Sequence, residues 1–174
     1  MALHIIVDGY NFIRSSRRLN ALDRQDLQLG REALQHMLSA YKKTKGHRIT
    51  IVFDGQGTLS SQPQRYQAKG VQIIFSRTGR SADDVIKNMA SREREKALVV
   101  SSDGEVMNFC TSQGATAISS EDFEDTVWRA IYDVESENEK KTAFSERKSG
   151  TKKRGPSRRL SKKERQLRRK VGKL

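Results

Sequence analysis

The sequence has a single cysteine, two prolines and no long apolar run among its 174 residues. One cysteine, Cys110, excludes an internal disulfide and any zinc site built from several cysteines, and it fits a reducing compartment. No segment approaches the roughly 18 apolar residues that a membrane-spanning helix needs. Residues 1–7 lead directly into a short apolar strand, without the basic region and apolar stretch of a secretory signal. We therefore expect a cytoplasmic protein with no membrane partner.

Positive charge is what the sequence has in excess, and it is concentrated at one end. The chain carries 34 Lys and Arg against 21 Asp and Glu, for a net charge of +13. Residues 140–174 hold 16 basic and 2 acidic residues, whereas residues 1–139 hold 18 basic and 19 acidic ones. A nearly neutral body with a polycationic tail predicts a polyanionic partner. The low apolar content of the tail favours nucleic acid over an anionic membrane.

The length predicts one domain with an appendage rather than two domains. The periodic apolar pattern fades after about Ser136, and from Lys140 only scattered apolar residues remain among Ser, Gly and basic residues. Such a composition cannot build a core. We expect a domain over residues 1–137 and a basic tail over residues 138–174 that is disordered or becomes ordered on RNA. Within the tail, residues 161–173 can become helical once their charges are neutralised.

Short runs rich in Ile and Val predict the strands of a parallel sheet. Continuous apolar character is typical of strands covered on both faces, and the helical periodicity between them indicates βαβ units, so the predicted fold class is α/β. The strong runs are 3–7, 49–53, 71–75 and 97–100, with 116–118 as a weaker fifth candidate. The stretch 55–70, rich in Gly, Ser and Gln, predicts a long loop.

Helical stripes fill the intervals between these runs. Gly46 predicts the end of the first helix, and Ser81 is the predicted N-cap of the second. The apolar stripes are made by Leu34, Met37, Leu38 and Tyr41; by Val85, Ile86, Met89 and Ala90; by Val106, Met107 and Cys110; and by Phe123, Val127, Ile131 and Val134.

Every strong strand brings an acidic residue to the same edge of the predicted sheet, and ligands of open parallel sheets bind beyond the carboxyl ends of the strands. Asp8 ends the first strand, Asp54 the second, and Asp103 follows the fourth. The pair Asp83 and Asp84 opens a helix after the third. Any one of them can be an ordinary turn or helix-capping Asp. Several like charges in one cleft, however, repel unless a cation is bound. The pattern therefore predicts a metal site.

Oxygen ligands without a nearby Cys or His indicate Mg²⁺ or Mn²⁺ rather than zinc, and the three histidines lack metal-ligand spacing. Such an ion suits phosphodiester hydrolysis. Asn11, three residues after Asp8, can reach the same edge and orient a carboxylate or a water. An Asn at this position is equally typical of a turn or a helix cap.

Four motifs in this order resemble the NYN domains, which are related to PIN-type nucleases, and in particular their YacP-like branch. The motifs are IIVDGYN at 5–11, IVFDG at 51–55, SADD at 81–84 and VVSSD at 99–103. The likeness spans about residues 3–134 and leaves the basic tail outside it. It implies a three-layer sandwich in which a parallel sheet of about five strands, ordered 3-2-1-4-5, has helices on both faces.

The resemblance also implies an endoribonuclease that depends on Mg²⁺ or Mn²⁺ and acts on mRNA or rRNA in association with the ribosome. Carried over position by position, it implies Asp8, Asp83, Asp84 and Asp103 as metal ligands, with Asn11 and Asp54 as the other candidate active-site residues. The tail is longer and more charged than the core of the family leads us to expect, which suggests contact with ribosomal RNA.

Twelve basic residues within positions 152–173 are candidate RNA contacts. Their charges would strengthen RNA binding and attract RNA to the protein, whereas the scarcity of aromatic residues after Phe144 argues against base stacking by the tail. A merely solvated extension is the alternative. The twelve are Lys152, Lys153, Arg154, Arg158, Arg159, Lys162, Lys163, Arg165, Arg168, Arg169, Lys170 and Lys173.

Three other classes of protein fit parts of this pattern. A non-catalytic RNA- or ribosome-binding module on the same fold is the main alternative, although no acid of the motifs is replaced by a neutral residue. A haloacid-dehalogenase-type phosphatase needs a second acid two residues after the first-strand Asp, where this chain has Tyr10. A response-regulator receiver needs paired acids just after the first strand, and the sequence has none there.

Overall fold

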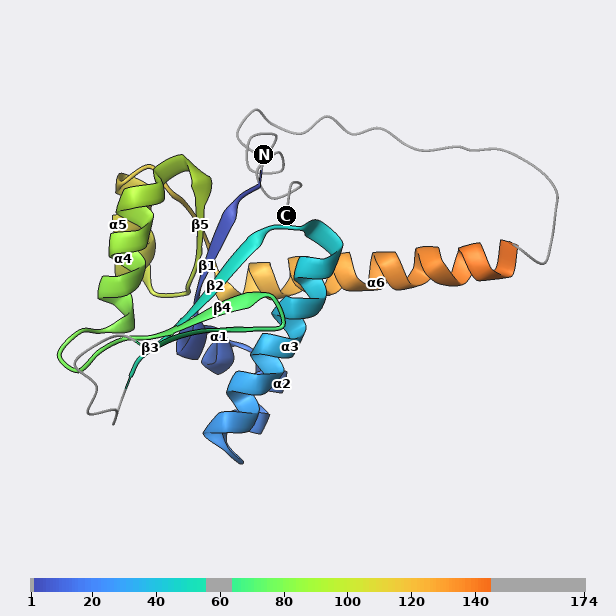
Figure 1. Cartoon of the computed structure of the whole chain (residues 1–174), viewed down its shortest axis with the longest axis horizontal. Coiled ribbons are helices and arrows are strands. Elements are labelled where there is room, and N and C mark those ends of the chain that lie inside the picture. The colour runs from blue at the N-terminus through green and yellow to red at the C-terminus, as the bar shows by residue number, and fades with distance from the viewer. Residues whose placement is uncertain (1, 56–63, 145–174) are drawn as a thin grey trace.

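The computed structural model describes residues 2–55 and 64–144. In these residues, six strands form one sheet at the centre of the fold (Figure 1). The strands are β1 (His4–Asp8), β2 (Arg48–Phe53), β3 (Gln64–Ala68), β4 (Val71–Phe75), β5 (Ala97–Val100) and β6 (Thr116–Ile118). Their order across the sheet is β3-β4-β2-β1-β5-β6. Neighbouring strands pair in parallel, except that β3 is antiparallel to β4.

The five predicted strands all form, and they lie in the order 3-2-1-4-5 that the family resemblance implies. The expected loop over residues 55–70 is wrong in its second half, because Gln64–Ala68 forms β3 as an added edge strand. The turn to β4 is made by Lys69 and Gly70, whose φ angles of +50° and +84° suit a tight hairpin. Since β3 lies at an edge and its side chains are mostly exposed, it has no apolar run to reveal it.

Helices cover both faces of the sheet and complete the predicted three-layer sandwich (Figure 1). On one face lie α1 (Gly9–Ser15), α2 (Arg17–Asp23), α3 (Leu27–Lys45) and α6 (Ser120–Phe144), and on the other lie α4 (Ala82–Glu93) and α5 (Gly104–Ser112), with the short 3-10 helix η1 (Arg94–Lys96) before β5. In the part of the chain that the structure describes, no helix is long and apolar enough to span a membrane.

The core is split between the two faces, as the alternation of side chains along a strand requires. Ile5 and Val7 of β1 pack towards α1, α3 and α6, whereas Ile6 between them packs towards α4 and α5. Tyr41 and Phe123 are both fully buried in the larger core and meet edge to face, with ring centroids 5.6 Å apart. Because a buried phenylalanine side chain contributes roughly 1.5–3 kcal/mol, the burial of Phe123 helps to hold α6 against α3 and the sheet.

Both predicted helix signals are confirmed. Gly46 adopts a φ of +71° and its N–H donates to the carbonyl oxygen of Lys42, which ends α3. Ser81 is the N-cap of α4. Helix α6 continues to Phe144, so the predicted domain boundary at residue 137 falls inside a helix. The twelve basic residues proposed as RNA contacts lie outside the described residues.

Candidate active site

Asp8 lies at the carboxyl end of β1 and is only 7 % exposed. Its side chain caps α1, because Oδ1 accepts the backbone N–H of Asn11 at 3.3 Å. Its other oxygen, Oδ2, accepts the hydroxyl of Ser101 at 3.2 Å. The carboxylate is therefore held in one orientation by groups from both neighbouring segments, at the centre of the acid-bearing edge of the sheet.

Three of the predicted carboxylates act on one another across this edge. Burial raises the pKa of Asp8 to about 6, the hydrogen bonds from Asn11 and Ser101 oppose the rise, and the charges of Asp83 and Asp103 add to it. Burial likewise raises the pKa of Asp83, and the next largest cause is the charge of Asp103. The end of β1 and the starts of α4 and α5 thus bring three negative groups into mutual repulsion.

Ser101 joins two of these acids through a single hydroxyl group. It is fully buried after β5, donates to Asp8 and accepts the backbone N–H of Asp103 at 3.2 Å. Asp103 in turn caps α5, since its Oδ1 accepts the N–H groups of Glu105 and Val106 at 2.8 and 3.2 Å. The sequence did not single out Ser101, because a serine before a capping Asp is common in such turns.

Asn11 reaches the same edge, as the spacing predicts, and there it fixes the backbone. Its Oδ1 accepts the N–H of Ser102 at 2.7 Å and the hydroxyl of Ser120 at 3.0 Å. The hydroxyl of Ser102 donates to Glu121 at 2.8 Å, and this bond is the main cause that lowers the pKa of Glu121. Glu121 is a further acid near the edge that the sequence analysis missed, because it follows the weak fifth strand and opens a helix.

The carboxylates of Asp54 and Asp84 each accept a local hydrogen bond. The carboxylate of Asp54 accepts the hydroxyl of Ser76 at 2.9 Å. Asp84 forms a capping box with Ser81, in which each side chain accepts the backbone N–H of the other residue, at 3.2 and 3.4 Å. The charges that most raise the pKa of Asp8 are those of Asp83 and Asp103. Asp83 therefore faces the common edge, whereas its neighbour Asp84 caps the helix.

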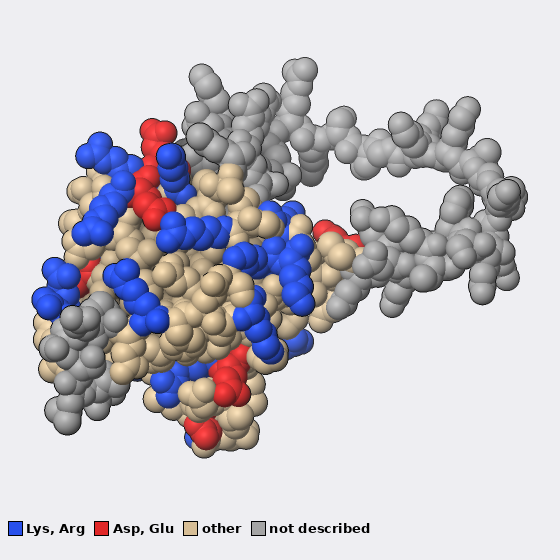
Figure 2. Space-filling model, in the orientation of Figure 1, with Lys and Arg blue, Asp and Glu red and all other residues tan. Residues whose placement is uncertain are grey.

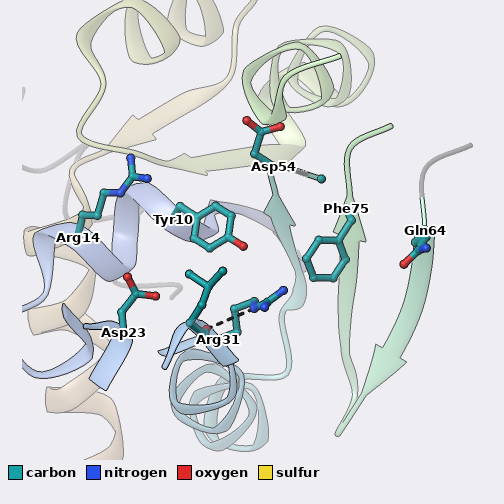
Figure 3. Close-up of a pocket in the computed structure, with 9 residues that line it drawn as sticks. Tyr10, Arg14, Asp23, Arg31, Asp54, Gln64 and Phe75 are labelled. Atoms are coloured by element: carbon teal, nitrogen blue, oxygen red, sulfur yellow. Dashed lines mark hydrogen bonds between the residues drawn. The ribbon is translucent and has the colours of Figure 1, made fainter. Parts of the chain in front are cut away.

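A hollow of about 230 Å³ lies beside the acids, at the carboxyl ends of β2 and β4 (Figure 3). In Figure 3, Tyr10 and Phe75 stand on opposite sides of the space, Arg31 reaches in from α3, and Asp54 lies above. The complete lining is Tyr10, Arg14, Asp23, Leu27, Arg31, Asp54, Gly55, Gln64 and Phe75.

The family model of the YacP-like NYN domain matches residues 5–171, which is most of the chain. The chain belongs to this family. NYN domains are part of the PIN-like nuclease superfamily, which supports a nuclease-type function for this YacP-like NYN chain. The match also corrects one expectation, because it includes most of the basic tail, whereas the likeness was expected to end near residue 134.

Relatives of this YacP-like NYN chain come from Bacillus subtilis. The uncharacterized protein YacP is 27 % identical over 86 residues, which is 49 % of this chain and 50 % of YacP, so the match spans about half of that relative. Crystal structures of Rae1 (YacP), as a tryptophan-to-leucine mutant and without a stated mutation, give TM-scores of 0.70 and 0.67, each at 24 % identity. They cover 81 % and 83 % of this chain and 84 % of each Rae1 chain, and they show the shared fold.

Members of the PIN-like superfamily generally use divalent metals, and the donor chemistry of this YacP-like NYN domain fits such an ion. Asp8, Asp83 and Asp103 offer oxygen ligands, and the ion pairs found within residues 2–55 and 64–144 involve none of them. A cation would relieve the repulsion that raises the pKa of Asp8. Within those same residues, no three His, Cys, Asp or Glu side chains are gathered closely enough to hold a metal ion as they stand.

Proposed function

We propose that this YacP-like NYN domain is an endoribonuclease that depends on Mg²⁺ or Mn²⁺ and hydrolyses phosphodiester bonds of RNA. The observation that carries the proposal is the coupling of three carboxylates, Asp8, Asp83 and Asp103, at the carboxyl edge of a parallel sheet. Asp8 is buried and Asp83 is partly buried, whereas Asp103 is exposed, so the ionised form of Asp8 is the costliest of the three and a bound cation would offset that cost.

The residues at this edge have two roles in the proposed site: some would bind the metal ion, and others position these ligands. Asp8, Asp83 and Asp103 would hold the ion, whereas Asp84, which the resemblance implies as a fourth ligand, caps α4. When bound, a divalent cation supplies an activated water and stabilises the charge that develops on the scissile phosphate. Ser101 fixes the separation of Asp8 and Asp103 through its two hydrogen bonds. In this proposal Asn11 is a positioning residue, because both bonds to its side-chain oxygen come from neighbouring segments.

RNA as substrate is supported by the nuclease family and by the distribution of charge. Figure 2 shows Lys and Arg side chains more prominently than Asp and Glu on one face of the domain, so the nearly neutral body is not uniform in charge. The tail adds a net charge of +14 over residues 140–174. Association with ribosomes in the cytoplasm, and cleavage of mRNA or rRNA there, is the finer part of the proposal, and it is supported by this tail and by the resemblance.

A metal titration followed by a cleavage assay tests the activity. The full-length chain should cut single-stranded RNA with added Mg²⁺ or Mn²⁺ and lose activity in EDTA. The double variant Asp8→Asn with Asp103→Asn should bind RNA normally yet cut at least about 100-fold more slowly, because several kcal/mol of metal-derived stabilisation are removed. The matched control Asp133→Asn, an exposed acid on α6, should cut at the wild-type rate.

The outcomes separate the proposal from its main alternative. Cleavage retained by the double variant would reject these carboxylates as the site. RNA binding without cleavage under any metal would favour the non-catalytic RNA-binding module. The proposed ribosome association is tested with a chain that stops after Phe144. This chain keeps α6 and should no longer co-sediment with ribosomes. Unchanged co-sedimentation would remove the tail from the proposal.

A further inference from the structure

The hollow shown in Figure 3 combines aromatic surface with charges of both signs. Tyr10 packs against Phe53, with ring centroids 5.0 Å apart, and Phe53 in turn stacks on Phe75 at 5.3 Å. The guanidinium carbon of Arg31 lies 5.5 Å from the centroid of the Phe75 ring. Aromatic rings and a planar guanidinium therefore face the same small space, and both are surfaces on which flat rings stack.

Within the described residues, the charged groups of the hollow are not neutralised by ion pairs, although two of them have hydrogen bonds within the chain. In the described part of the chain, no ion pair involves Arg14, Arg31, Asp23 or Asp54. One carboxylate oxygen of Asp23, Oδ1, is buried and has no hydrogen-bond partner among the described residues. All four of these charged residues line the hollow together with Tyr10. The hollow thus offers arginine donors and carboxylate acceptors side by side.

We propose that this hollow binds one unpaired nucleobase of the RNA substrate, beside the bond that is cut. The inference rests on the proposed function, because Tyr10 follows Asp8 by two residues and the hollow opens at the same edge of the sheet. At about 230 Å³ the space is below the roughly 300 Å³ at which sites for drug-sized ligands begin, so it suits a single ring system. A base needs a stacking surface together with donors and acceptors for its edge, and the hollow provides all of them.

The phosphates next to such a base have a path along α1 and α2. Arg14, which lines the hollow, also lines a second and more open one of about 470 Å³, together with Arg17 and Arg24. Ser15 and Asn20 supply further polar groups there. These three arginines line one hollow that shares Arg14 with the base pocket, so they can bind the phosphates of a strand whose base enters the pocket.

Abasic interference in the cleavage assay tests the base pocket. Short single-stranded RNAs, each with one base removed at a different position, are cut by the full-length chain with Mn²⁺, and kcat/KM is measured at each bond. Base removal at one fixed offset from the cut should lower kcat/KM about tenfold, in line with the stacking of one base. At other offsets the change should be small.

Substitutions then assign the effect to the hollow. Arg31→Gln should lower kcat/KM on intact RNA about tenfold and should abolish the extra loss on the RNA that lacks the critical base, because the two changes remove one interaction. Asp23→Asn, a nearly isosteric change, should reduce the same base dependence. Arg48→Gln is the matched control, since Arg48 begins β2 whereas the hollow lies at the other end of that strand. This variant should still show the full loss of kcat/KM when the base at the critical offset is removed.

Two results would overturn the inference. An equal response to base removal at every offset would mean that the chain senses only the phosphate backbone. A full offset effect that persists in both Arg31→Gln and Asp23→Asn would place the base elsewhere. In either case cleavage itself continues and the proposed function stands, whereas a wild-type chain that never cuts RNA would remove both.

Discussion

Replacement of Asp8 by Asn should make the metal-free protein more stable at neutral pH, although it should abolish cleavage. The carboxylate of Asp8 is buried and faces two other acids, so its ionised form costs free energy in the folded chain. Asn has nearly the same shape and can still cap α1 through its oxygen. Its NH₂ group can donate to the Ser101 hydroxyl, which is an acceptor as well as a donor.

The size of the effect follows from the pKa. A rise from 3.8 to about 6 corresponds to about 3 kcal/mol at about 1.4 kcal/mol per pKa unit. Because the folded pKa is raised, the folded state binds more protons than the unfolded state between these two pH values, and stability falls as pH increases through them. The cost is absent below the unfolded pKa and complete above about pH 6. We expect Asp8→Asn to gain ~1–3 kcal/mol at pH 7.5, with 3 as the upper bound.

Urea unfolding of the full-length chains in EDTA, from pH 3.5 to pH 8, measures this difference. The stability of Asp8→Asn and of wild type should coincide at the acid end and separate as pH rises. Added Mg²⁺ should then stabilise the wild type more than the variant, because a ligand stabilises the state that binds it. The exposed control Asp133→Asn should stay within about 0.5 kcal/mol of wild type throughout.

The reasoning fails if Asp8→Asn is no more stable than wild type at pH 7.5 in EDTA. It also fails if the difference persists unchanged at pH 3.5, because the gain would then have another origin than the charge of Asp8.

Three further predictions concern other parts of the edge. Asn11→Ala removes the acceptor of two hydrogen bonds and should cost about 1–3 kcal/mol in urea unfolding, with a lower kcat and little change in RNA affinity. Asp84→Asn removes a negative charge from the first turn of α4 and should cost about 0.3–1 kcal/mol, but it should slow cleavage much less than Asp83→Asn, and equal losses of kcat would show that both acids hold the ion. Arg17→Gln with Arg24→Gln should weaken RNA binding uniformly across sequences and reduce its salt slope by about 2, whereas an unchanged slope would exclude phosphate contacts there.

The sheet could be predicted because its strands are buried on both faces and therefore carry continuous apolar runs. Edge strand β3 could not, since its exposed side chains have no such signature. The acids could be predicted from their position after the strands. Which of them face the common edge could not be predicted. Asp83 and Asp84 are adjacent on α4, and successive helical residues point about 100° apart, so only one can face the common edge. Which one does so depends on where the helix starts relative to the sheet.

The residues that position the acids could not be predicted from the sequence, for a different reason. The partners of Asn11 lie 91 and 109 positions away, on segments that only the folded sheet brings together. Ser101 acts through two bonds to atoms that no local motif connects. The base pocket likewise draws on α1, α2, α3, β3 and β4, so its composition appears only after folding. Sequence spacing located the acidic edge, whereas long-range packing decides how each residue contributes there.

Helix α6 sets the distance between the acidic edge of the sheet and the basic C-terminal segment. Its first residue, Ser120, is bonded to Asn11 beside the acids, and 25 residues at 1.5 Å each carry the chain about 37 Å to Phe144, clear of the sheet in Figure 1. The polycationic segment is therefore attached to the far end of a stiff rod. Insertion or removal of whole turns in the outer part of that rod would shift the start of the basic segment by about 5.4 Å per turn and leave the acidic edge unchanged.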